Sequence, residues 1–103
     1  MMQIVYAGTE FLTGDAIARA LVEYSRALAR AGSSESIEVP IRDANGNLES
    51  AVFLVGPASQ IVARHVESDG AAELTDEAVV SELTTRTQRL TRPHPGQFLE
   101  DWI

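Results

Sequence analysis

The hydrophobic pattern of residues 13–32 predicts an amphipathic helix around which the rest of the chain is organised. Apolar residues recur there at steps of three and four: Ile17, Ala20, Leu21, Tyr24, Leu28 and Ala31. This spacing places them on one side of a helix with 3.6 residues per turn. Thr13 is positioned to cap the first turn and Gly32 to end the helix in a left-handed conformation.

A second row of small residues lies about 120° round the same helix. Its members are Ala18, Val22, Ser25 and Ala29. Small side chains allow another backbone to approach closely, so this row is one candidate interaction surface. The alternative is that alanine is simply a strong helix former and Val22 a single exposed apolar residue.

Before the helix, residues 2–7 are β-branched and aromatic and predict a strand, which Gly8 ends. We expect residues 8–13 to form a turn into the helix. After it, residues 36–43 alternate apolar and polar positions, and Asn45-Gly46 predicts a hairpin with a second strand at 48–55.

The predicted hairpin has a definite register if Asn45 and Gly46 are its two turn residues. Val39 then faces Val52, and Ile37 faces Leu54. Ala51, Phe53 and Val55 would lie on the reverse side, away from the helix. An apolar reverse face needs a cover, either the end of this chain or a second copy. Pro40 lacks a backbone donor, which places its strand at an edge or beside a bulge.

Residues 61–67 fit either a strand or a helix, and we favour a strand because β-branched residues follow a turn. Residues 75–90 predict a second helix, capped by Thr75. The fold expected is therefore α+β, with a small, mostly antiparallel sheet in the order β-α-β-β-β-α and two helices mainly on one face.

We expect one domain over residues 1–90 and a proline-containing C-terminal tail over residues 91–103. The tail ends in four large apolar residues: Phe98, Leu99, Trp102 and Ile103. Terminal residues are usually poorly ordered unless they dock, and an exposed tryptophan is unfavourable in water. Three destinations remain open: the tail's own domain, the other copy of a dimer, and a different protein.

Charge and composition exclude several classes of function. The net charge is −7, so a phosphate backbone would be repelled unless basic residues gathered on one face, and only Arg86, Arg89 and Arg92 form a candidate cluster. The absence of cysteine excludes disulfides and thiolate metal sites. No apolar run is long enough to cross a bilayer, and no basic leader is present, so we expect a cytoplasmic protein.

Evidence for catalysis or cofactor binding is weak. Gly8 and Gly14 match neither dinucleotide nor P-loop patterns. His65, Glu67 and Asp69 alternate and could share one face of a strand as metal ligands or an acid/base site. The alternative is that the same alternation marks a solvent-exposed, acidic strand edge with no bound metal and no catalytic role. We expect no cofactor, no nucleic-acid partner and no membrane association.

The element order, the sequence YAGTEF near the start, the glycine-containing hairpin and a strand ending in GPAS together resemble small uncharacterised actinobacterial proteins of about this length. The resemblance covers most of residues 2–90. It implies an α+β domain of bacterial origin with no established activity, and it assigns no functional residue.

The function expected from the sequence is a noncatalytic protein-interaction module, most simply a homodimer. Three surfaces are candidates: the reverse face of the hairpin with Phe53 and Val55, the small row with Ala18, Val22 and Ala29, and the tail. The tail could also capture a different protein. The alternative is a small-ligand-binding protein or enzyme with a cleft near His65 and the turns at Gly8 and Gly56.

Overall fold

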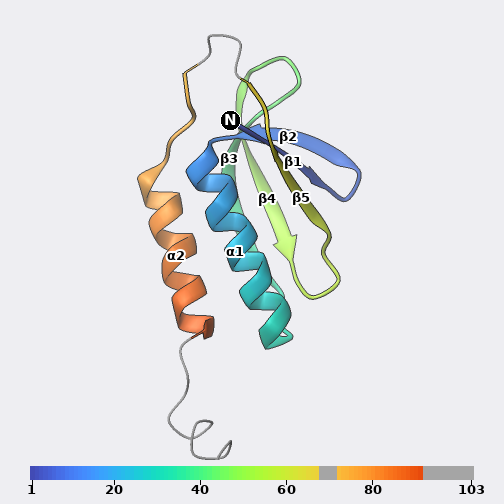
Figure 1. The fold of residues 1–103 in the computed structure, drawn as a ribbon, viewed down its shortest axis with the longest axis vertical. Helices are drawn as coiled ribbons and strands as arrows, with labels where there is room; N and C mark the ends of the chain where they lie inside the picture. The colour runs from blue at the N-terminus through green and yellow to red at the C-terminus, as the bar shows by residue number, and fades with distance from the viewer. Residues whose placement is uncertain (68–71, 92–103) are drawn as a thin grey trace, which may run out of the picture.

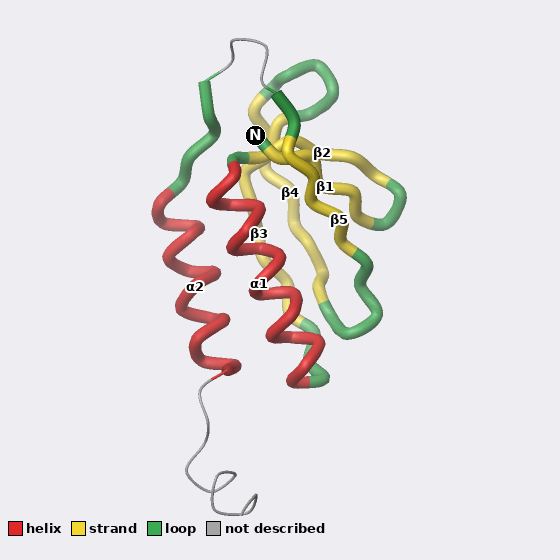
Figure 2. Tube along the Cα trace, in the orientation of Figure 1, coloured by secondary structure: helices red, strands yellow, loops and turns green. Residues whose placement is uncertain are grey.

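A computed structural model of the chain describes residues 1–67 and 72–91. Its elements in order are β1 (Met2–Tyr6), β2 (Thr9–Thr13), α1 (Asp15–Ala31), β3 (Glu35–Arg42), β4 (Leu48–Val55), β5 (Ile61–His65) and α2 (Glu77–Thr91). The five strands form one antiparallel sheet, and both helices lie on the same side of it, with α1 between α2 and the strands (Figures 1 and 2). The α+β fold predicted from the sequence is confirmed.

One strand, β2, lies where the sequence predicted a turn. Ala7 and Gly8 both have positive φ, 52° and 78°, and form a two-residue reversal between β1 and β2. Such reversals match the twist of paired strands, but a non-glycine residue at positive φ is uncommon. The predicted turn at residues 8–13 was therefore wrong, and the described order is β-β-α-β-β-β-α.

The sheet has the strand order β4-β3-β2-β1-β5 and is sharply bent between β2 and β3. These two strands share a single residue pair, Leu12 with Arg42. Pro40 lies where this pairing has ended, so its missing N–H breaks no ladder, and its carbonyl accepts a hydrogen bond from Thr13 Oγ1 at 2.8 Å. The bend brings the ring of Phe53 edge-on to Tyr6 and Phe11, each at 5.5 Å between centroids.

The register of the β3–β4 hairpin differs by one residue from the prediction. The backbone N–H of Gly46 donates to Asp43 O, and that of Asp43 donates to Asn47 O, both at 3.0 Å. The loop therefore has three residues, with Gly46 at φ 81°. Ile37 faces Phe53 instead of Leu54. A one-residue shift inverts the faces of a strand.

The inner face of the bent sheet and one side of α1 form the core. Fully buried residues include Ile4, Ile17, Leu21, Val39 and Phe53. Gly32 ends α1 in the left-handed conformation, as predicted. Thr13 does not cap α1, because its hydroxyl is used on Pro40; Glu73 Oε2 instead accepts the N–H of Asp15 at 2.9 Å.

Helix α2 packs along α1, and the two run in the same direction (Figure 1). Asp76, not the predicted Thr75, caps its N-terminus: Asp76 Oδ1 accepts the N–H of Val79 at 3.1 Å. Leu83 is the only buried residue that this helix contributes among the described residues. Neither helix described in 1–67 and 72–91 is long and apolar enough to cross a membrane.

Candidate functional site

The outer face of the sheet carries the most exposed large hydrophobic side chains of the described residues. They are Leu48 (63% exposed), Val52 (68%), Leu54 (62%) and Val62 (59%). The first three lie on β4 and the last on β5, the two edge strands of the sheet. An apolar outer face was predicted, but the hairpin register places these residues there instead of Phe53 and Val55.

Strand β4 also has one backbone edge with which no strand of the described residues pairs; on this edge the Leu54 carbonyl is occupied by the Tyr6 hydroxyl. Because the pair Asp43–Asn47 is hydrogen-bonded, the alternation of antiparallel pairing directs the backbone groups of even-numbered β4 residues away from β3. Leu54 agrees with this assignment, since its carbonyl accepts a hydrogen bond from the Tyr6 hydroxyl on β1. Glu49 is the only charged residue of β4, which has no proline or lysine to block pairing with another strand.

A groove of about 600 Å³ lies where the two edge strands converge. The loop 56–60 joins β4 to β5 across this end of the sheet. Val5, Leu54, Pro57, Ala58 and Val62 supply apolar walls. We name this depression the β4–β5 groove.

The polar groups that residues 1–67 and 72–91 place in the groove are uncharged. The hydroxyl of Ser59 accepts the N–H of Gly56 at 3.0 Å and lies 3.4 Å from the Tyr6 hydroxyl. Gly8 also lines the groove. The two turns predicted to border a cleft, at Gly8 and Gly56, are therefore brought together, whereas His65 lies at the opposite end of β5 and does not line it.

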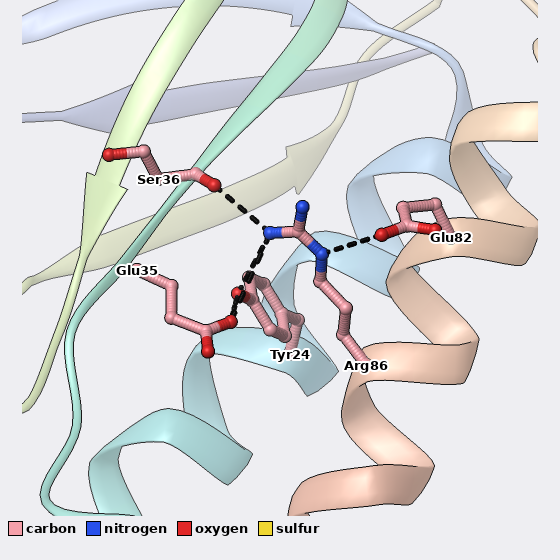
Figure 3. Close-up of polar contacts among 5 residues, drawn as sticks. All are labelled: Tyr24, Glu35, Ser36, Glu82 and Arg86. Atoms are coloured by element: carbon pink, nitrogen blue, oxygen red, sulfur yellow. Dashed lines mark hydrogen bonds and ion pairs between the residues drawn. The ribbon is translucent and has the colours of Figure 1, made fainter.

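A polar cluster between α2, α1 and β3 centres on Arg86 (Figure 3). Its Nη1 donates to the Tyr24 hydroxyl at 3.2 Å and to Ser36 O at 3.0 Å, and its Nε donates to Glu82 Oε1 at 2.8 Å. The Tyr24 hydroxyl in turn donates to Glu35.

The electrostatics of this cluster favour a structural role. Burial, together with the hydrogen bond to Glu35, raises the pKa of Tyr24, so its hydroxyl remains protonated. The hydrogen bond to Glu82 raises the pKa of Arg86. With its Nε and Nη1 hydrogens already paired inside the chain, the Arg86 guanidinium fastens α2 to α1 and β3.

A second cluster surrounds the N-terminal ammonium of Met1. The ammonium lies 3.0 Å from both Asp15 Oδ1 and Glu73 Oε1. Its hydrogen bond lowers the pKa of Asp15, and the hydrogen bond from the Asp15 N–H lowers that of Glu73. These contacts tie the start of β1 to the start of α1 and to the segment before α2.

The candidate metal ligands are not brought together. His65 is 66% exposed, and its Nδ1 lies 3.8 Å from Asp15 Oδ1. Glu67 is exposed after the end of β5, and Asp69 lies outside the described residues. Within residues 1–67 and 72–91, no three His, Asp or Glu side chains are close enough to hold a metal ion.

The predicted interaction residues have different positions in the structure. Ala18, Phe53 and Val55 are buried in the core of the same chain, so the folded chain does not present them at its surface. Val22 is half-buried and Ala29 exposed on α1. Phe98, Leu99, Trp102 and Ile103 lie outside the described residues.

Comparison with protein-family models, with curated proteins and with solved structures gives no match for this chain. The arguments for function therefore come from the outer face of β4 and from the β4–β5 groove.

Proposed function

We propose that this protein is a noncatalytic interaction module that self-associates through the outer face and free edge of β4. The observation that carries the proposal is the exposure of Leu48, Val52 and Leu54 on a strand whose outer edge is unpaired. Exposed apolar side chains and free backbone groups on one strand favour the addition of another strand.

A second copy of the chain is the partner that fits this strand. A two-fold axis places the same surface patch of each copy against the other, and antiparallel pairing suits such an axis. With the axis at Ala51, Leu48 of each copy faces Leu54 of the other, and Val52 faces Ser50. This register joins even-numbered residues, whose backbone groups are directed to the free edge. Because the Leu54 carbonyl already accepts the Tyr6 hydroxyl, the pairs of Ser50 with Val52 and the N–H of Leu54 would form the new ladder.

Charge is compatible with this arrangement although the whole chain carries −7. Repulsion between two acidic copies is reduced where the contact surface itself has little charge, and β4 contains only Glu49. In the proposed register, the two Glu49 side chains are not opposite each other. We expect association to strengthen as salt screens the remaining charges.

The test is the molar mass of the full-length protein, measured by light scattering over a range of concentrations. We expect a dimer for the wild type and a monomer for Val52→Lys, because a lysine at this position would meet the apolar strand of the other copy. Val22→Lys on α1 and Trp102→Ala in the tail are matched controls for the other two candidate surfaces. A monomeric wild type, or a Val52→Lys protein that stays dimeric, would contradict the proposal.

A further inference from the structure

The β4–β5 groove is open to solvent and apolar, and no segment of residues 1–67 or 72–91 fills it. We propose that it receives the apolar side chains of residues 98–103 of the same chain, with Trp102 as the anchor. This inference is argued separately from self-association through β4, although Leu54 lies both on that strand and in the groove.

The chemistry of the groove suits an aromatic anchor with one polar group. Val5, Pro57, Ala58 and Val62 offer apolar contacts, and among the described residues no Asp, Glu, Lys or Arg lines the groove. A buried tryptophan needs a hydrogen-bond acceptor for its indole N–H. The side chains of Ser59 and Gln60 on the groove wall carry such acceptors.

The position of α2 puts the groove within reach of the tail. Helix α2 ends at Thr91, at the same end of the molecule as the loop 56–60 (Figure 1). The two shorter dimensions of the molecule are 26 and 20 Å, so two points at the same level along its long axis are at most about 33 Å apart in a straight line, the diagonal of that cross-section. Trp102 is eleven positions after Thr91, and an extended or polyproline-like chain of eleven steps spans roughly 34–40 Å.

Docking within one chain is favoured over docking between chains. A short tether gives the tail an effective concentration in the millimolar range at its own groove. Pro93 and Pro95 also reduce the number of conformations that the tether loses on docking.

Tryptophan fluorescence tests this directly, because Trp102 is the only tryptophan in the chain. In the full-length wild type we expect emission that is blue-shifted relative to the urea-unfolded protein, with reduced quenching by acrylamide. Both properties should be independent of protein concentration. Val62→Lys, which places a charge in the groove, should restore the emission and quenching of the unfolded protein.

Val52→Lys is the matched control, since Val52 (68% exposed) is at least as exposed as Val62 (59%) but does not line the groove. Val52→Lys should lower the molar mass and leave the fluorescence unchanged. Val62→Lys should change the fluorescence and leave the molar mass unchanged. Far-UV circular dichroism verifies that both variants fold. The proposal is overturned by wild-type emission equal to that of the unfolded chain, by shielding that Val62→Lys leaves intact, or by shielding that appears only as concentration rises, which would indicate docking between copies.

Discussion

Replacing Arg86 by methionine should detach α2 from the rest of the domain. Methionine retains an apolar side chain but loses the charged hydrogen bonds to Ser36 O and the Tyr24 hydroxyl. Hydrogen bonds with one charged partner contribute about 1.5–3 kcal/mol, whereas the pairing with the half-exposed Glu82 contributes at most about 1 kcal/mol. Because the contributions are coupled, we expect a loss of about 2–3 kcal/mol in the free energy of unfolding.

This loss is a large share of what holds α2 in place, because Leu83 is the only residue of the helix that is fully buried among the described residues. At roughly 4–8 °C per kcal/mol for a domain of about this size, the melting temperature should fall by roughly 10–20 °C. Urea denaturation followed by circular dichroism measures the free energy. Hydrogen exchange then shows whether amides of α2 lose more protection than those of β3 and β4.

Arg89→Met provides the control, because Arg89 is exposed on the same helix. It should change stability by no more than about 0.5 kcal/mol. A double-mutant cycle with Tyr24→Phe isolates the contact between Arg86 and the hydroxyl. Two results would contradict this role of the cluster. One is an equal loss in the free energy of unfolding for Arg86→Met and Arg89→Met; the other is additive losses for Arg86→Met and Tyr24→Phe in the double-mutant cycle.

Three further predictions concern the core, the hairpin turn and acid stability. Phe53→Ala should lower the free energy of unfolding by about 3–5 kcal/mol, because it leaves a cavity at a fully buried position. A loss below about 1 kcal/mol, measured by urea denaturation, would contradict this prediction. Gly46→Ala should destabilise by about 1 kcal/mol or more because alanine is unfavourable at φ 81°, and a proton NMR spectrum with unchanged β3–β4 cross-strand contacts would show that the register persists. The lowered pKa values of Asp15 and Glu73 mean that their ionised forms stabilise the fold at neutral pH and that this stability is lost as the pH falls below about 4. Glu73→Gln should flatten the decline in urea midpoint between neutral and acidic pH, and an unchanged slope would remove Glu73 from the explanation.

The elements that the sequence predicted well are those whose pattern has one physical solution. Helix α1 has a long apolar periodicity and a glycine at its end, and both features reappear in the structure. Strand β3 keeps Ile37, Val39 and Ile41 towards the core as the alternation required.

The predictions that were wrong depended on choices that a local pattern leaves open. Asn45-Gly46 fits a two-residue turn, but it also fits a three-residue loop in which Gly46 alone has positive φ. Asp43 stabilises the three-residue loop, because its Oδ1 accepts the backbone N–H groups of Asn45 and Asn47, both at 2.9 Å. That choice turned Phe53 inward and Val52 outward, and so moved the candidate surface to other residues.

The β4–β5 groove was only partly predictable. Gly8 and Gly56 were recognised as turns, but their proximity depends on the bend between β2 and β3, which no local pattern specifies. The walls of the groove come from β1, β4, β5 and two loops, so its shape is a property of the tertiary fold.

The position of β1 between β2 and β5 also constrains the order in which the molecule can assemble during synthesis. One side of β1 pairs with β2 as soon as the reversal at Ala7 and Gly8 forms, but the other side places Met2 opposite His65. Contacts so distant in the chain form slowly, since a long loop must close before they are gained. A nascent polypeptide therefore carries β1 with one edge unpaired until Ile61–His65 has left the ribosome, and during this interval that edge is open to misassembly.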